Sequence, residues 1–212
     1  TGYVRLVAGE WDLIASVGGP APPHQPGHAH CDALAFELAF AGRRIVTDTG
    51  VFEYVEGERR RRSRATASHA TIQIDGEEQA EVWASHRVGG RPRVELTSFD
   101  ASGRAEATCR GWSRPSTLHR RRFRVAPDAV ELEDSIEGPT RSFVSRFPLA
   151  PELAVELQIG TTPPIARCRA ERVGADAGLV FEIELPAALE WRIEEGELYP
   201  TFGRARTRSV LV

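Results

Sequence analysis

Short runs of alternating apolar and polar residues dominate this chain and predict β-strands along its whole length. Residues 32–40 give the clearest example, because Leu34, Phe36, Leu38 and Phe40 alternate with smaller or polar residues. This period of two is typical of a strand with one buried face. The same criteria predict further strands at 3–8, 11–17, 43–48, 69–74, 93–99, 104–109, 118–125, 129–136, 141–147, 154–159, 165–172, 179–185, 190–193 and 209–212.

Turn and loop signals separate these runs at regular spacing. Gly9-Glu10 and Asp75-Gly76 predict tight turns, and the Pro/Gly-rich residues 18–27 predict a loop. Residues 49–68 are polar, rich in arginine and predicted to be a long connection. No amphipathic helix longer than about two turns is indicated. The pattern therefore predicts an all-β domain over residues 1–212: a large antiparallel β-sandwich of two sheets, of the supersandwich type.

Composition narrows the classes of partner. The 212 residues carry a net charge of −3, and all 27 basic residues are arginine. No overall basic field exists to attract nucleic acid, so an acidic substrate requires a local cluster of cations. Three scattered cysteines predict free thiols, and no apolar run reaches the roughly 20 residues of a membrane span. Because Met is absent even at position 1, we expect a piece of a longer protein.

The densest chemical signal is the histidine pair His28 and His30. On an extended chain, residues i and i+2 point to the same face, so both imidazoles can reach one small volume. Each histidine could also be an ordinary polar residue with satisfied hydrogen bonds. The pair favours a metal site without identifying the remaining ligands.

Two longer stretches carry a resemblance to a known family. PGHAHCDALAFELAFAGRRIVTDTGVFEY at 26–54 and RATASHATIQIDGEEQAEVW at 64–83 resemble the heparinase II/III-like family, which includes heparin and alginate lyases. Weaker similarity continues at 117–125 and 130–138. The resemblance implies a carboxy-terminal β-sandwich that follows an α/α-toroid domain of the same protein. It also implies that this chain by itself is inactive.

The resemblance further implies one zinc ion held by His30, Asp48 and His69. Two imidazoles and a carboxylate with an open fourth position suit zinc. We expect the ion to hold the chain around His30 rigid instead of attacking the substrate. The implied function is β-elimination in acidic, uronate-containing polysaccharides of the heparin, heparan or alginate kind.

The resemblance also supplies candidates for the cleft. His28 and Tyr54 match cleft residues of the family and are candidate catalytic groups, while Arg64 matches a motif arginine. Arg64 and Arg61 are candidate contacts to the anionic glycan, since arginine binds carboxylate and sulfate bidentately. The arginine run at 59–62 can equally be a solvated charged loop.

Departures from the family pattern fall close to these residues. Ala70 replaces the asparagine that usually follows the third ligand, and Arg62-Ser63 replaces an aromatic pair. The expected toroid, which supplies the principal catalytic groups of family members, is absent from this sequence.

Alternative interpretations remain. A metallo-β-lactamase-like motif would need histidine where Ala33 stands, and a cupin would need its glutamate closer than Glu37. The stronger alternative is a carbohydrate-binding or structural module that docks a toroid without catalysis. The compartments expected for such a family are the periplasm or the exterior of a bacterium.

Overall fold

A computed structural model gives the fold of this chain. It describes residues 2–22, 24–48, 50–51, 53–140, 143–148, 166–173, 176–183, 196–198 and 204–211. The strands expected at 154–159 and 190–193 lie outside the described residues. No helix in the described part is long and apolar enough to cross a membrane.

The described elements are almost all strands, as the periodicity predicts. The first half contains β1 (Tyr3–Ala8), β2 (Trp11–Ser16), η1 (Pro26–His28), β3 (Phe36–Phe40), β4 (Arg43–Val46), α1 (Glu58–Arg64), η2 (Thr66–Ser68), β5 (Ile72–Ile74), β6 (Val82–Trp83), β7 (Arg87–Val88) and β8 (Arg93–Asp100). The second half contains β9 (Arg104–Arg110), β10 (Leu118–Ala126), β11 (Ala129–Glu137), β12 (Phe143–Ser145), β13 (Ala166–Val173), β14 (Asp176–Ile183), β15 (Gly196–Leu198) and β16 (Arg204–Leu211).

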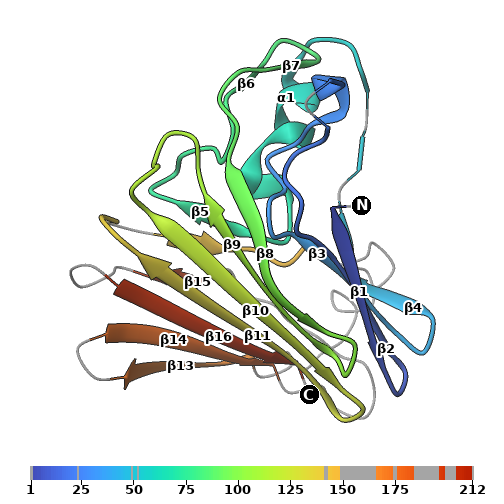
Figure 1. Cartoon of the computed structure of the whole chain (residues 1–212), viewed down its shortest axis with the longest axis vertical. Helices are drawn as coiled ribbons and strands as arrows, with labels where there is room; N and C mark the ends of the chain where they lie inside the picture. Colours follow the sequence, from blue (N-terminus) through green and yellow to red (C-terminus); the bar gives the residue numbers. More distant parts are fainter. Residues whose placement is uncertain are drawn as a thin grey trace, which may run out of the picture.

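Two main sheets form the sandwich (Figure 1). One has the order β1-β2-β3-β4, and the other has the order β13-β14-β16-β11-β10-β9-β8. Smaller sheets have the orders β15-β12-β5 and β6-β7. Apart from the parallel pair β14 and β16, every strand pair described is antiparallel. The predicted all-β sandwich is confirmed.

The inner faces of the two main sheets share one apolar core. Trp11 and Leu13 of the first sheet belong to the same buried cluster as Phe123, Val125 and residues of β9 and β11 in the second. Along β10, every second residue is buried, which is the pattern expected for a strand packed on one face. Burial of these side chains is the main source of stability for the domain.

Two predicted strands begin later than expected. The strand predicted at 32–40 is β3, which begins at Phe36, because Leu34 adopts a left-handed backbone conformation with a φ of 61°. A leucine rarely adopts this conformation, and it ends the period-two pattern locally. The strand predicted at 69–74 begins at Ile72 as β5, and His69 follows the short helix η2 instead. The predicted connection at 49–68 contains helix α1, of two turns.

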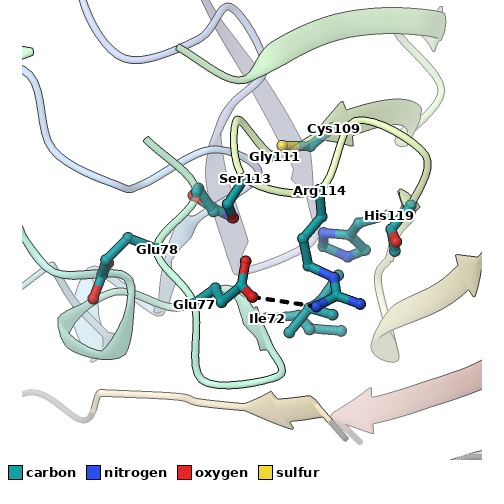
Figure 2. A pocket seen from close by; sticks show the side chains of 11 residues that line it. Ile72, Glu77, Glu78, Cys109, Gly111, Ser113, Arg114 and His119 are labelled. Atoms are coloured by element: carbon teal, nitrogen blue, oxygen red, sulfur yellow. Dashed lines mark hydrogen bonds and ion pairs between the residues drawn. The ribbon is translucent and has the colours of Figure 1, made fainter. Parts of the chain in front are cut away.

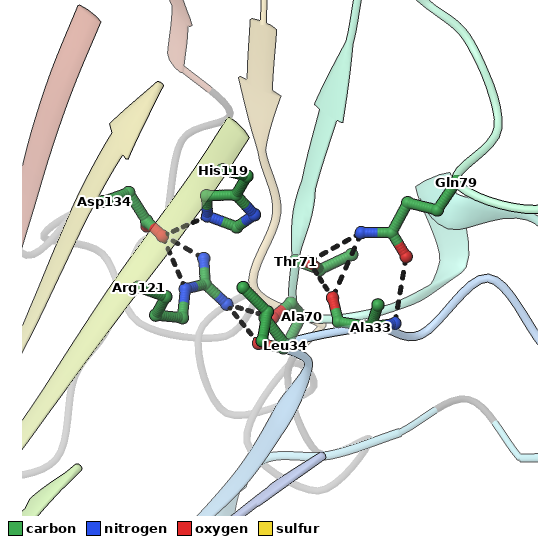
Figure 3. Close-up of polar contacts among 8 residues, drawn as sticks. All are labelled: Ala33, Leu34, Ala70, Thr71, Gln79, His119, Arg121 and Asp134. Atoms are coloured by element: carbon green, nitrogen blue, oxygen red, sulfur yellow. Dashed lines mark hydrogen bonds and ion pairs between the residues drawn. The ribbon is translucent and has the colours of Figure 1, made fainter. Parts of the chain in front are cut away.

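A buried ionic triad occupies inward-facing positions of β10 and β11 (Figure 3). Arg121 donates from Nε and Nη2 to the two carboxylate oxygens of Asp134, at 2.7 and 2.9 Å. His119 Nε2 lies 2.6 Å from Oδ1 of the same carboxylate. All three residues are at most 2% exposed. Buried charges of this kind are tolerated only when they are paired and hydrogen-bonded.

Removing Arg121 tests this triad. Arg121→Met leaves the buried Asp134 carboxylate without its cation, so we expect a loss of about 3–5 kcal/mol in the free energy of unfolding. Arg122→Met is the matched control, since this neighbour pairs with Glu106 and Glu133 at the surface and we expect about 1 kcal/mol or less. Urea denaturation measures both, and equal losses would contradict the assigned difference.

The lowered pKa of Asp134 also predicts how the free energy of unfolding changes in acid. Although burial by itself raises the pKa of Asp134, the charge of Arg121 and the hydrogen bond with His119 lower it from 3.8 to about 2. A depressed folded-state pKa contributes stability above the unfolded pKa, and this contribution is lost as the pH falls from about 4 through about 2. Denaturant unfolding should show this loss, with a shallower decline in Asp134→Asn. Identical slopes in the two proteins would exclude Asp134 as its source.

Candidate functional site

His28 and Tyr54 form the exposed half of the candidate site. His28 is the last residue of the short helix η1, so the predicted extended backbone through His28 is wrong. Its Nδ1 lies 3.3 Å from the Tyr54 hydroxyl, and the two rings meet edge to face with centroids 5.6 Å apart. Tyr54 is 55% exposed. An imidazole and a phenol in hydrogen-bond contact can exchange a proton with each other or with a ligand.

The three predicted metal ligands form the buried half. His30 and His69 are 7% and 0% exposed, and their ring centroids are 5.3 Å apart. His69 Nδ1 lies 2.5 Å from Oδ2 of Asp48, whose Oδ1 accepts a hydrogen bond from the Gly50 amide. The structure therefore brings together three side chains that are 18 and 21 residues apart in sequence.

Burial and charge shift the pKa values in this cluster. Burial, reinforced by His69 and Arg60, lowers the pKa of His30 to about 4. The pKa of Asp48 is lowered as well: burial opposes the shift, but the hydrogen bond and charge of His69 outweigh it. A neutral imidazole next to a carboxylate is the protonation state that binds a divalent metal.

Two imidazoles and a carboxylate suit zinc, but the ligand atoms of His30, Asp48 and His69 do not converge on one point in this structure. Nε2 of His69 is buried without a hydrogen-bond partner, whereas Nδ1 of the same ring faces Asp48. Within the described residues, no three His, Cys, Asp or Glu side chains are already arranged to hold a metal ion. Two ligands of one tetrahedral zinc lie roughly 3.3 Å apart, so Asp48 Oδ2 and His69 Nδ1 would have to separate by somewhat less than 1 Å to share an ion.

Arg64, a predicted substrate contact, is a structural residue instead. It is 1% exposed, and its guanidinium donates to the carbonyl oxygens of Ala29, Trp83, Ala84 and Arg87. Burial lowers its pKa. Arg64, predicted to contact the glycan, is therefore buried in this structure, where its hydrogen bond to the Ala29 carbonyl fixes the backbone between His28 and His30.

Two other arginines of helix α1, Arg60 and Arg61, lie on opposite sides of the surface: one is buried and the other is exposed. Arg61 is exposed and pairs with Glu58 at 3.1 Å, so it remains available as a surface cation. Arg60 is 0% exposed, and its Nη1 lies 3.3 Å from Nε2 of His30. The sequence does not distinguish Arg60 from its neighbours, because a run of four arginines has no apolar spacing to indicate which member is buried.

Hydrogen bonds from buried side chains to backbone groups position the segments that carry His30 and His69 (Figure 3). Arg121 Nη1 donates to the carbonyl oxygens of Leu34 and Ala70, at 2.9 and 2.7 Å. Gln79 accepts from the Ala33 amide and donates to the Ala33 carbonyl, at 2.9 and 3.1 Å. Thr71 donates to the same carbonyl at 2.7 Å. These contacts tie residues near His30 to residues near His69.

A cavity of about 220 Å³ opens beside Asp48 on the outer face of the first sheet. Asp32, Glu37, Tyr3 and Ile14 contribute to its lining. Burial raises the pKa of Asp32 to about 6, and one of its carboxylate oxygens is buried without a partner. Asp32 lies only two positions after His30, but the sequence pattern does not indicate that one of its carboxylate oxygens is buried.

A smaller cavity of about 30 Å³ lies between β5 and the loop after β9 (Figure 2). His119, Cys109 and Arg114 point toward it, and Arg114 contacts Glu77 at 3.4 Å. Its lining includes none of the predicted site residues, so we treat it as separate from the candidate site.

Comparison with known proteins gives a family and several similar folds. The sequence model of the family described as "Heparinase II/III-like, C-terminal" matches residues 1–212. No curated protein matches the chain. A mutant of the heparan sulfate lyase HepC from Pedobacter heparinus is similar in structure, with a TM-score of 0.54 and 19% identity over 70% of this chain.

Two heparinase III structures give similar values. The BT4657 gene product has a TM-score of 0.52 and 20% identity, and a second heparinase III has a TM-score of 0.52 and 18% identity. Each covers 70% of this chain. At such identities the likeness shows the fold alone, and this chain spans only 23% of the length of each of the three structures. Because the family match covers every residue, this chain belongs to the heparinase II/III-like family and corresponds to its C-terminal part.

Proposed function

We propose that this chain is the zinc-containing domain of a polysaccharide lyase that cleaves uronic-acid glycans by β-elimination. The observation that carries the proposal is the contact between an exposed His28–Tyr54 pair and a buried His30–Asp48–His69 cluster, bridged by Arg60. Family membership and the names of the similar structures, a heparan sulfate lyase and heparinase III, support the same chemistry.

The exposed pair has the groups that elimination requires. Breaking the glycosidic bond needs removal of a weakly acidic proton next to the uronate carboxylate and protonation of the leaving oxygen. The His28 imidazole and the Tyr54 hydroxyl, 3.3 Å apart, can take these two roles at one face of a sugar ring. Arg61, exposed on the neighbouring helix, is a candidate contact for the acidic glycan.

The buried cluster is proposed to hold one zinc ion through His30, Asp48 and His69. When bound, the ion would supply a rigid cross-link between three separate segments of the chain, since none of the three side chains is more than about one-third exposed. His30 lies two residues from His28, so the ion would anchor the chain directly after the short helix that ends at His28. The metal is therefore assigned a structural role.

The remaining catalytic groups are proposed to come from an N-terminal α/α-toroid domain of the same protein. This chain spans 23% of the length of the similar lyase structures, which leaves ample sequence for such a domain in a longer protein. The His28–Tyr54 pair is exposed and could form one wall of a cleft between the two domains. The acidic polysaccharide would then bind in this cleft.

A second candidate function is a carbohydrate-binding or structural module that docks the toroid without contributing to catalysis. The burial of Arg64 favours it, because one of the two expected glycan contacts is not accessible. The two functions differ in whether His28 and Tyr54 affect turnover in the full-length protein.

The zinc site is tested by metal analysis of the purified chain. We expect about one zinc per chain in the wild type, none in His30→Ala, and a lower melting temperature in that variant because the cross-link is lost. His24→Ala, at an exposed histidine, is the matched control and should keep its metal. Zinc bound equally by all three proteins would place the site elsewhere, and an unchanged melting temperature would refute the structural role.

The catalytic assignment is tested in the full-length protein with an unsulfated or sulfated uronate glycan. The ultraviolet absorbance of the unsaturated product measures turnover. Loss of a general acid or base reduces kcat by about 10²–10⁴-fold, so His28→Ala and Tyr54→Phe should fall in this range. His24→Ala, at an exposed histidine outside the candidate site, serves as the control. Wild-type rates in the first two variants would favour the docking module.

A further inference from the structure

Arg60 is a fully buried cation whose described contacts include no carboxylate. Its Nε donates to the Ser85 carbonyl at 2.7 Å, and its Nη2 donates to the Gly27 carbonyl at 3.1 Å. The third contact joins Nη1 to Nε2 of His30 at 3.3 Å. Burial lowers the pKa of Arg60, but a guanidinium stays protonated in proteins. A buried charge held mainly by neutral acceptors is costly, and such groups are enriched at functional sites.

The contact with His30 fixes the protonation of that ring. A guanidinium has donors and no acceptor, so Nε2 of His30 must accept the hydrogen bond. In the neutral imidazole the proton then resides on Nδ1. The nitrogen Nε2 has one lone pair, which can accept from Arg60 or bind a metal, but cannot do both.

The same guanidinium lies beneath the exposed pair. The Cζ atom of Arg60 is 5.0 Å from the centre of the Tyr54 ring, within the range of a cation–π contact. The Tyr54 hydroxyl in turn contacts Nδ1 of His28. Arg60 also holds the Gly27 carbonyl, one residue before His28. A continuous set of contacts therefore runs from His30 through Arg60 to Tyr54 and His28.

We infer that Arg60 is a positioning residue that links His30 to the His28–Tyr54 pair and competes with a metal ion for Nε2 of His30. Metal binding at Nε2 would release Nη1 of Arg60, and the loss of that anchor would change how Tyr54 and His28 are presented. The competition rests on the proposed zinc site, whereas the link between His30 and Tyr54 does not.

The test compares Arg60→Gln with Arg61→Gln in this chain. Arg61 is the next residue of helix α1, is exposed and pairs only with Glu58 among the contacts described for it, so it controls for loss of charge. NMR of chelator-treated protein gives the ¹⁵N shift of His30 Nε2 and the ring-proton shifts of Tyr54. We expect Arg60→Gln to move both sets of signals and Arg61→Gln to move neither.

Zinc titration against a competing chelator provides the second measurement. Removing a charge-assisted hydrogen bond and a nearby cation should tighten zinc binding by about tenfold in Arg60→Gln and leave Arg61→Gln at the wild-type value. Should Arg60→Gln fail to fold, Arg60→Lys replaces it in both measurements. Lysine keeps the charge but lacks the planar fork, so it cannot reach all three acceptors together, and we expect signals of His30 and Tyr54 to move in this variant also.

The outcomes separate this inference from the proposed function. Movement of His30 signals without movement of Tyr54 overturns the link. Unchanged or weaker zinc binding in Arg60→Gln overturns the competition. If wild-type protein binds no zinc while both sets of NMR signals move, then the proposed zinc site fails and the competition with it, but the link stands.

Discussion

The buried ion pair between Arg121 and Asp134 is the interaction on which the rest of the structure depends. The Arg121 guanidinium donates from two nitrogens to the Asp134 carboxylate and from the third to the carbonyl oxygens of Leu34 and Ala70. One side chain of the large sheet thereby fixes two segments that lead to His30 and His69. Because the pair is excluded from water, these hydrogen bonds are strong and their directions are well defined.

Buried arginines recur throughout the region of the candidate site. Arg60, Arg64 and Arg121 are each at most 1% exposed, and each donates to backbone carbonyl oxygens of loops. Irregular backbone has unpaired carbonyl groups, and a planar fork with five donors can satisfy several of them together. The long connections of this domain are thus ordered by side chains instead of by sheet hydrogen bonds.

This arrangement gives the candidate site two layers. His30, Asp48 and His69 lie inside, while His28 and Tyr54 lie at the surface, and Arg60 contacts both layers. A change in the inner layer can reach the outer one through a single guanidinium. Under the proposed lyase function, this contact would couple the proposed zinc site to the exposed His28–Tyr54 pair.

The sequence by itself determined the all-β class, most strand positions and the family, because period-two patterns and local motifs are properties of neighbouring residues. It also placed His30, Asp48 and His69 in one site, although only through the family resemblance. Tertiary structure alone decided that Arg64 and Arg60 are buried, that His28 lies on a short helix, and that Leu34 turns the chain before β3. The burial of both arginines depends on carbonyl acceptors supplied by residues distant in sequence, and no local pattern of side chains encodes where those acceptors lie.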